Sequence, residues 1–544
     1  MPYLYSTDMN LSPAQAGGQS FSGGQFSAAR QSIIPDDAYW LGTCIDNDEF
    51  GNAITRRGSA ILGAQVGTTS PIQGMTTFYL TPGDASQCTI ACSNGLLYYW
   101  KQSNSTWNAL PASGTAWTQQ TGNDKHVHFA QVGGKLFVAN GVNNLHSIDW
   151  AGAGASEAGA TNVDPPAAPT WICNHTNRLV ATATGTVANR IYFSQFGNGS
   201  VGQWNRTLWS LEVGSNSFDI TGMLPWSNFD LFVMKDDSLW VVGCNPTYAV
   251  LDFTVQPLHR NIGCPAPRTA CQVGTDILLL TRLGVLKIDR SMATASTTEI
   301  QEPISKPIQD LINRINWSAV KDNAFAFYFN NRYFLNVPLD QDTTALTTIV
   351  YNTVTKKWMG SWGKGMDMHC AAVNDGLSPS RLRFGRFDGK VYEWLDYVKQ
   401  VDEVVATYQD NGVSYGSSVE TRAYDFSEPD SYKDLSTLKL EFLPTLSGAT
   451  PQVDGLVTVG VRLDSAGAIS VAQNFNPLAI QSTLPINLPF YLPIPGIKPK
   501  KVDISFLPPC LEASAVVSVP SGRLCLRKAI FSAYVGSIGV EVCS

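Results

Sequence analysis

The chain has 544 residues, of which 44% are hydrophobic and 10% aromatic, enough to build packed cores and to exclude intrinsic disorder over most of its length. Only 15% of the residues are charged, the formal net charge is −7, and no basic patch or tail is present, which disfavours a dedicated nucleic-acid binder. No apolar run reaches the roughly 18 residues that a transmembrane helix needs. The first residues lack the pattern of a secretory signal, so we expect a protein of several domains that folds in a cytosol.

Residues 1–39 are predicted to form a flexible N-terminal arm. The first 31 residues are rich in Gly, Ser, Gln and Ala and contain too little apolar surface to fold alone. Pro2, Tyr3, Leu4 and Tyr5 offer side chains for docking, so we expect the arm to become ordered on contact with a neighbouring subunit.

Eleven cysteines are spread from Cys44 to Cys543, and no Cys-x-x-Cys pair occurs. An odd number of cysteines in a large chain without a secretory signal argues against a disulfide framework. We therefore expect reduced and mostly buried thiols, which behave as small apolar side chains.

From residue 40 onward, short strands alternate with Gly, Asn, Asp and Ser turns. Seven units share a tight polar turn followed by an alternating apolar strand, and most are preceded by another apolar run, which indicates a hairpin. A period of about 40–50 residues with room for four strands is typical of a β-propeller blade, because a ring of blades buries both faces of each blade. The first apolar strand residues of the seven units are Leu97, Leu136, Leu179, Leu239, Val285, Tyr333 and Val391.

We therefore predict an all-β protein with a β-propeller of six to eight blades over residues 40–398. One or two β-sandwiches with irregular hairpins are the alternative. Helical spacing of apolar residues is clearest in residues 302–317, where Pro307 confines the helix to the part that follows it.

A second domain, β-sandwich-like, is predicted over residues 399–544. Residues 399–420 contain few large apolar side chains and are interpreted as a crossover. The later strands lack the propeller turn, which fits a sandwich. These strands are predicted at residues 438–443, 456–463, 502–506, 515–519 and 529–535.

A Pro-rich loop at residues 484–497 of this domain is predicted to be an interaction element. Its four prolines exclude a helix and a central strand. Its large apolar side chains, left in water, would form a patch that soluble monomers rarely tolerate. A loop folded back on its own domain is the alternative. The five candidate interface residues are Leu488, Phe490, Tyr491, Leu492 and Ile494.

No catalytic, cofactor or metal site is predicted. His126 and His128 alternate, so they share one face of a strand, and His146 is near in sequence, but no third ligand follows at a suitable spacing for a metal ion. We therefore expect a protein that is not an enzyme.

Residues 46–51 resemble a calcium-binding loop only in part. Asp46 and Asp48 match two ligand positions and Gly51 the turn glycine, but Arg57 stands where the final glutamate would be. We interpret the segment as an acidic turn.

A carbohydrate-binding or glycoside-hydrolysing β-propeller is the alternative function. Propellers can bind ligands in the central funnel, and catalytic carboxylates from different blades would leave no local pattern. The candidate stacking residues are Trp100, Trp240, Trp362 and Trp394.

Several segments occur in an order that resembles the tail nozzle proteins of short-tailed bacteriophages, also called tail tubular or hub proteins. The resemblance covers about residues 30–445, and the order of the segments is more specific than any one of them. The segments are Thr55-Arg56-Arg57-Gly58-Ser59-Ala60, residues 133–141, residues 189–197 followed by Trp204, residues 351–362 with the pattern Tyr-Asn-x-x-x-Lys-Lys-Trp, and residues 420–426 followed by Lys433-Asp434-Leu435.

This resemblance implies a structural virion protein whose β-propeller assembles into a homohexameric ring beneath the portal and the adaptor protein of the tail. It implies a channel for DNA ejection, through which the genome passes without specific binding. It also implies attachment of fibres, spikes or terminal tail proteins, and assembly in the cytoplasm of the bacterial host. An acidic ring would repel DNA phosphates and let the genome slide, whereas a basic lining would retain it.

Overall fold

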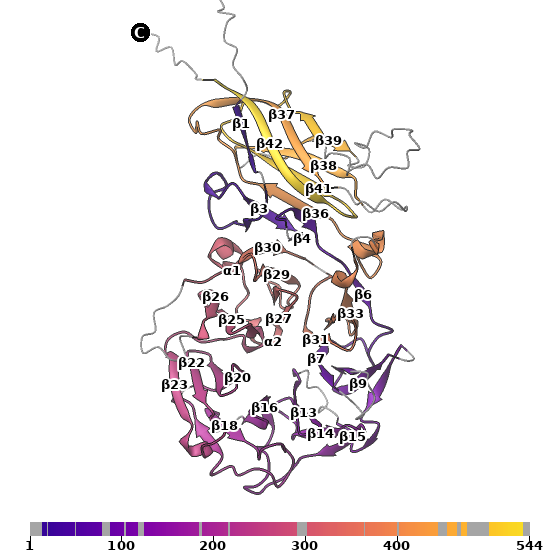
Figure 1. The fold of residues 1–544 in the computed structure, drawn as a ribbon, viewed down its shortest axis with the longest axis vertical. Helices are drawn as coiled ribbons and strands as arrows, with labels where there is room; N and C mark the ends of the chain where they lie inside the picture. The colour runs from indigo at the N-terminus through magenta and orange to yellow at the C-terminus, as the bar shows by residue number, and fades with distance from the viewer. Residues whose placement is uncertain are drawn as a thin grey trace, which may run out of the picture. The chain divides into compact units, whose positions relative to one another are not determined.

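The computed structural model describes residues 14–18, 20–48, 50–78, 88–102, 105–117, 125–183, 188–215, 218–290, 302–363, 365–399, 402–443, 454–464, 469–475 and 500–536 (Figure 1). They belong to two compact units. The first unit lies within residues 1–58, 354–362 and 398–544, and the second within residues 59–353 and 363–397. Regular structure in both units is almost entirely β-strand, which confirms the prediction of an all-β fold.

The second unit is a β-propeller with seven blades in its described part, arranged as a ring of antiparallel sheets (Figure 1). Blade 1 consists of β7 (Ile72–Phe78), β8 (Cys88–Ser93), β9 (Leu96–Lys101) and β10 (Thr106–Leu110). Blade 2 consists of β12 (His128–Val132), β13 (Lys135–Ala139), β14 (His146–Asp149) and β15 (Ala153–Ser156), with β11 (Ser113–Gly114) beside β15. Blade 3 consists of β16 (Pro169–His175), β17 (Arg178–Ala183), β18 (Arg190–Phe193) and β19 (Ser210–Glu212). Blade 4 consists of β20 (Ile220–Pro225), β21 (Asp230–Lys235), β22 (Leu239–Gly243) and β23 (Thr254–His259). Blade 5 consists of β24 (Cys271–Val273), β25 (Asp276–Thr281) and β26 (Gly284–Ile288). Blade 6 consists of β27 (Phe325–Phe329), β28 (Arg332–Val337) and β29 (Thr347–Asn352). Blade 7 consists of β31 (Cys370–Asn374), β32 (Arg381–Gly385) and β33 (Val391–Trp394).

The seven repeats found in the sequence fall in seven different blades. The aligned residue lies in the second strand of blades 2, 3 and 6 and in the third strand of blades 1, 4, 5 and 7. The two widest gaps in the repeat run from Leu179 to Leu239 and from Tyr333 to Val391. In both, the first residue lies in the second strand of its blade and the next in the third strand of the following blade, which lengthens the gap by one strand. The innermost strands are more evenly spaced, and they begin at residues 72, 128, 169, 220, 271, 325 and 370.

Tight turns explain why the repeat is visible in the sequence. Asn94 and Gly95, between β8 and β9, have φ angles of 48° and 69°, and Asn330 and Asn331, between β27 and β28, have φ angles of 45° and 60°. Two consecutive positive φ angles are typical of type I′ hairpin turns, which favour Asn and Gly and match the twist of the strands.

The ring is closed by a strand from the start of the unit. β6 (Ser59–Ile61) pairs antiparallel with β33, the last strand of blade 7. Across the junction of blades 7 and 1, Ile72 packs in one apolar cluster with Cys370 and Val391. This closure leaves no open edge between the first and last blades.

The first unit is a β-sandwich, as predicted, but it takes strands from both ends of the chain. One sheet has the order β4-β5-β42-β37-β40, with β1 paired to β42, and the other runs β3-β36-β41-β38-β39, with β2 and β30 beside β3. One apolar core, which includes Phe21, Leu438, Val459, Val517 and Phe531, is built from both sheets. The strands are β1 (Ala14–Gly18), β2 (Gly24–Gln25), β3 (Ala38–Thr43), β4 (Ile45–Asn47), β5 (Ala53–Thr55), β30 (Lys357–Ser361), β36 (Ser417–Thr421), β37 (Tyr432–Phe442), β38 (Val457–Leu463), β39 (Ser470–Phe475), β40 (Lys500–Asp503), β41 (Ala513–Val519) and β42 (Cys525–Gly536).

The predicted N-terminal boundaries differ from the structure. Where the structure describes residues 1–39, they are part of the sandwich: β1 pairs with β42, and Phe21 is fully buried in the sandwich core. The propeller begins at Ser59 and not at residue 40. The reason is that buried residues such as Tyr39 and Ile45 have their partners at the far end of the chain, and a local pattern does not reveal such pairing.

The remaining predicted elements are located as follows. The helix expected after Pro307 is short, with η5 (Lys306–Ile308) leading into α1 (Gln309–Asn313), and α2 (Val320–Asn323) follows. Among the described helices, none is long and apolar enough to cross a membrane. The Pro-rich loop at residues 484–497 lies outside the described residues, with its candidate interface residues Leu488, Phe490, Tyr491, Leu492 and Ile494.

Candidate functional site: the axial cavity of the propeller

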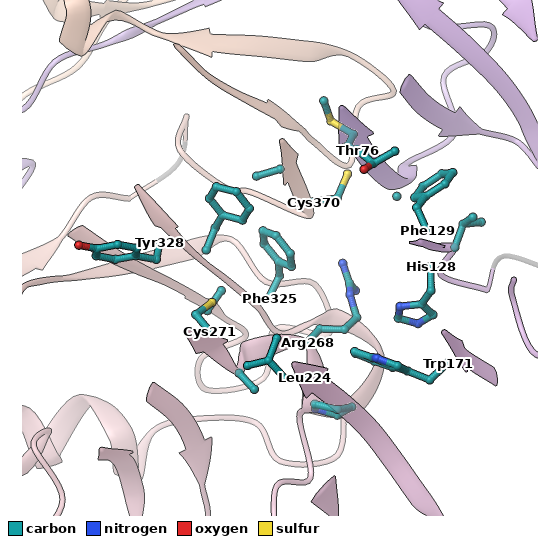
Figure 2. Close-up of a pocket in the computed structure, with 18 of the residues that line it drawn as sticks. Thr76, His128, Phe129, Trp171, Leu224, Arg268, Cys271, Phe325, Tyr328 and Cys370 are labelled. Atoms are coloured by element: carbon teal, nitrogen blue, oxygen red, sulfur yellow. The ribbon is translucent and has the colours of Figure 1, made fainter. Parts of the chain in front are cut away.

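The innermost strands of the seven blades converge on one axis, where they enclose a cavity of about 370 Å³ (Figure 2). Neighbouring strands come very close here, since a Cβ atom at Gly74 would lie only 2.4 Å from the carbonyl oxygen of Val127. Aromatic and apolar side chains make up much of the wall. The lining residues are Gln73, Gly74, Met75, Thr76, Val127, His128, Phe129, Trp171, Leu224, Pro267, Arg268, Ala270, Cys271, Gln272, Phe325, Ala326, Phe327, Tyr328, Cys370 and Ala371.

Arg268 carries the positive charge of this cavity. It lies in η3 (Pro267–Thr269), just before β24, and its side chain reaches toward the middle of the cavity (Figure 2). Its Nη1 lies 2.6 Å from Nε2 of His126 and 3.4 Å from the carbonyl oxygen of Asp322. Its Nη2 donates a hydrogen bond to the carbonyl oxygen of His369. Three blades therefore hold the guanidinium through neutral groups.

The charge of Arg268 is not neutralised by an ion pair within the described part of the chain, where its polar contacts are the imidazole and the carbonyl oxygens just named. Its guanidinium carbon lies 5.2 Å from the ring centre of Phe325, at cation–π distance. Burial lowers the pKa of Arg268 to about 10, so the side chain stays protonated at neutral pH. The carboxylate of Asp322 favours the charged form of Arg268 electrostatically, but no ion pair joins the two within the described residues. A buried cation whose direct contacts are neutral attracts an anion.

Three histidines surround this arginine. The ring centres of His126 and His369 are 4.6 Å apart with an angle of 62° between the planes, and the ring of His128 lies 3.9 Å from that of Trp171. Nδ1 of His369 is 2.8 Å from the carbonyl oxygen of Ile72. Because a carbonyl oxygen accepts only, Nδ1 of His369 carries the proton.

The histidines are neutral at physiological pH. Burial, and secondly the charge of Arg268, lower the pKa values of His128 and His369 to about 3. The same two causes lower the pKa of His126 well below its usual value. Burial also raises the pKa of the Cys370 thiol to about 12. Within the described lining, the cavity therefore carries a single positive charge in an otherwise neutral wall.

The described residues contain no group of three or more His, Cys, Asp or Glu side chains placed to hold a metal ion. His126 and His128 both lie near Arg268, whereas His146 is buried in β14, the third strand of blade 2. A guanidinium at hydrogen-bond distance from His126 would also repel a metal cation.

The tryptophans considered for sugar stacking mostly serve the cores. Trp100, Trp362 and Trp394 are 4%, 0% and 1% exposed, so they present no open ring face. Trp240 is half-buried, and Arg260 lies over its ring with 6.0 Å between the guanidinium carbon and the ring centre.

In the acidic turn at residues 46–51, of which residue 49 lies outside the described residues, both aspartates bind backbone N–H groups. Oδ1 of Asp48 accepts hydrogen bonds from the backbone N–H groups of Phe50, at 3.0 Å, and Asn52, at 2.8 Å. Oδ1 of Asp46 accepts one from the N–H group of Asn47 at 2.9 Å. These bonds hold the connection between β4 and β5.

The Thr-Arg-x-Gly segment that supports the family resemblance lies in a buried ion network of the first unit. Nη1 and Nη2 of Arg56 lie 3.0 Å and 2.6 Å from the two carboxylate oxygens of Asp410, and the guanidinium carbon lies 3.8 Å from the ring centre of Tyr415. A Cβ atom at Gly58 would lie 2.0 Å from the carbonyl oxygen of Gln409, so the glycine permits this close approach.

A second set of charges extends this network. Arg57 pairs with Glu403 at 2.5 Å, and Arg523 lies 3.8 Å from the same carboxylate and 3.1 Å from Asp454. The hydroxyl of Tyr408 donates to Glu403 at 2.8 Å. Apart from Arg57, whose side chain is 19% exposed, the charged groups are almost fully buried, and they are mutually paired, which is typical of structural ion networks.

Sequence inspection did not single out Arg268 and His369. A usable signal is their position on the repeat: His126, Arg268 and His369 each precede the innermost strand of their blade by one to three residues. Equivalent positions on different blades meet at the same end of the axis. That signal requires the innermost strands to be identified first.

No protein-family model matches the sequence, and no curated protein matches it. Among solved structures, the chain is similar to the WD40 β-propeller domain of Doa1, with 8% identity and a TM-score of 0.39, over 62% of this chain and 97% of that one. It is also similar to YCF48 bound to a D1 peptide, with 10% identity and a TM-score of 0.37, over 64% of this chain and 97% of that one. These similarities concern the β-propeller fold.

Proposed function

We propose that the protein is a structural subunit of the tail of a short-tailed bacteriophage, a nozzle protein that forms a homohexameric ring in the DNA ejection channel. The ring would follow the portal and adaptor and would anchor fibres, spikes or terminal tail proteins. The order of motifs between about residues 30 and 445 is the observation that carries this proposal.

The connectivity of the chain supports a mechanical role. The chain passes between its two units four times, after residues 58, 353, 362 and 397. Several covalent connections transmit force between two units better than a single linker does. In addition, the motif residues Arg56 and Gly58 lie in a buried ion network with Asp410, where they serve the architecture of the first unit.

In such a ring, DNA would pass between subunits and not along a propeller axis. Side chains of all seven blades narrow that axis to a cavity of about 370 Å³, far too small for a DNA duplex. The net charge of −7 per chain would keep DNA from adhering to the channel wall.

The oligomeric mass in solution and in assembled particles tests the proposal. We expect six chains of 59.0 kDa each to assemble into a ring. Light scattering would report the mass of this assembly in solution, and electron microscopy would show the ring in particles that contain the chain. A protein that stays monomeric at high concentration and is absent from phage particles would contradict the proposal.

A sugar-binding function has less support, because three of the four candidate stacking tryptophans are buried in cores. A glycan array with the intact chain separates the two functions, since the nozzle proposal requires no glycan recognition by the propeller.

A further inference from the structure

We propose that the axial cavity binds an organic carboxylate with an apolar body, and that Arg268 is the residue that holds the carboxylate. The proposal concerns a site on one propeller and does not depend on assembly into a ring. Failure of either proposal would therefore leave the other intact.

The first step of the argument is the charge balance of the cavity. Arg268 is half-buried and protonated, and its polar contacts within the described residues are neutral: one imidazole and two carbonyl oxygens. Removing a guanidinium from water is costly unless an anion compensates it. Figure 2 shows the side chain reaching into the cavity between Phe325 and His128, where a ligand could meet it.

The second step selects the kind of anion. A planar guanidinium matches a carboxylate through two parallel hydrogen bonds. The described lining supplies one positive charge, since His128 and the cysteine thiols are neutral, so a monoanion balances it. A phosphate dianion would leave a negative charge in a wall built mainly from apolar groups, which is unfavourable.

The third step concerns the rest of the ligand. Phe129, Trp171 and Phe325 line the cavity, and the neutral ring of His128 packs on Trp171 at 3.9 Å between ring centres. Such walls favour an apolar or aromatic group. The volume of about 370 Å³ suits a body about as large as one aromatic amino acid and lies at the lower end of ligand pockets.

Calorimetric titration of the full chain with N-acetylphenylalanine tests the proposal. The matched probe is N-acetylphenylalanine amide, which has the same body without the charge. We expect the amide to bind at least about tenfold more weakly, because a charge-assisted pair is lost. Equal binding of the two probes, or no binding of the acid at millimolar concentration, would overturn the proposal.

Variants then locate the site. Arg268→Met should weaken binding of the acid at least about tenfold, and Arg268→Lys should restore part of it. Arg282→Met is the matched control: Arg282 also stacks on an aromatic ring, with 5.5 Å to the ring centre of Trp317, but does not line the cavity. Unchanged binding by Arg268→Met, or an equal loss in Arg282→Met, contradicts the assignment.

A substitution that fills the cavity covers the case in which Arg268→Met does not fold. Thr76 lines the cavity and is labelled in Figure 2. Thr76→Phe should abolish binding while Arg268 is retained, and unchanged binding in this variant would place the ligand elsewhere.

Three further probes test the choice of a carboxylate and identify its source. Phenyl phosphate should bind more weakly than the acid, and tighter binding would overturn the choice of a carboxylate. A peptide that ends in a free phenylalanine and its amidated form complete the set. If the free peptide binds at least as well as N-acetylphenylalanine, a chain terminus is the ligand class, and if it binds far less well, a small free acid is. Both outcomes support a carboxylate site, whereas preference for the amidated peptide contradicts it.

Discussion

Arg56 and Asp410 are 354 residues apart in the sequence and form a two-point ion pair, with oxygen–nitrogen distances of 3.0 Å and 2.6 Å. The Arg56 side chain is 0% exposed and that of Asp410 10% exposed. The pair joins the segment that leads into the propeller to the segment that follows it in the sequence. Its strength therefore bears on the integrity of the first unit.

Breaking this pair from one side should be strongly destabilising. We expect Arg56→Met to lower the stability of the first unit by about 3–5 kcal/mol, because the buried carboxylate of Asp410 loses the guanidinium that balances its charge. The transition of that unit in scanning calorimetry measures the loss. Arg314→Met is the matched control, since Arg314 and Asp340 form a similar two-point pair in which both side chains are about half exposed. An equal effect of both substitutions would show that burial of the Arg56 pair is unimportant.

Truncation of the N-terminus tests the revised boundary of the sandwich. Removing residues 1–31 deletes β1 from the edge of β42 and removes Phe21, which is fully buried, from the core. We expect the first unit to lose several kcal/mol, since burying one large aromatic side chain contributes about 3–5 kcal/mol. Removing residues 1–13 retains both β1 and Phe21 and should cost much less. If the longer truncation unfolds no earlier than the shorter one in thermal melts, β1 and Phe21 contribute little.

Acidification should destabilise the propeller between about pH 6.5 and pH 4. Burial lowers the pKa of His369 to about 3, while histidine in unfolded chains titrates near pH 6.5. In this window the unfolded state binds a proton that the folded state does not, so stability falls as the pH falls, by about 1 kcal/mol per pH unit for this residue. Denaturant unfolding at several pH values should show a flatter dependence for His369→Asn. Tyr328→Phe, a substitution in the same cavity that leaves every histidine in place, should retain the slope of the original chain. An unchanged slope in His369→Asn would contradict the assignment.

Thiol labelling should distinguish the folded from the unfolded chain. Ten cysteines lie in the described residues, and all ten are buried. Burial raises the pKa of several of them, among them Cys173 and Cys264, both to about 12, so the reactive thiolate is scarce. We expect at most one fast-reacting thiol in the native protein and eleven in denaturant. Rapid native labelling of three or more cysteines would show that a blade or the sandwich opens readily.

Sequence reasoning reached the fold because the blade turns are local. Pairs such as Asn330–Asn331 adopt the positive φ angles of a hairpin turn, and only a few residue types do so comfortably. The seven hairpins of the repeat equal the seven described blades in number. The repeat matches second strands of some blades to third strands of others, because both hairpins of a blade use the same turn chemistry.

The N-terminal boundary of the propeller and the axial cavity could not be predicted in this way, because both depend on contacts between residues far apart in the sequence. Residues 14–18 carry no strong strand pattern, and their partner strand, β42, lies near the opposite end of the chain. Arg268 follows two prolines in a loop-like segment, and its meeting with His126 and His369 depends on the ring arrangement of the blades. The pair His126 and His128 is visible in the sequence because it is local, but its neighbour on the axis is an arginine.

The interleaving of the two units has a consequence for synthesis on the ribosome. The propeller ring is complete once β33 meets β6, with Tyr392 opposite Ile61, so it needs nothing beyond residue 397. The sandwich, in contrast, pairs Ala14 with Ala533 and cannot close its first sheet until almost the whole chain has emerged. Domains generally fold as units during translation. β1 therefore stays without its partner strand, β42, through the synthesis and closure of the entire propeller. A chain terminated early would leave an intact ring attached to an unfinished sandwich, with exposed strand edges that mark it for degradation or aggregation.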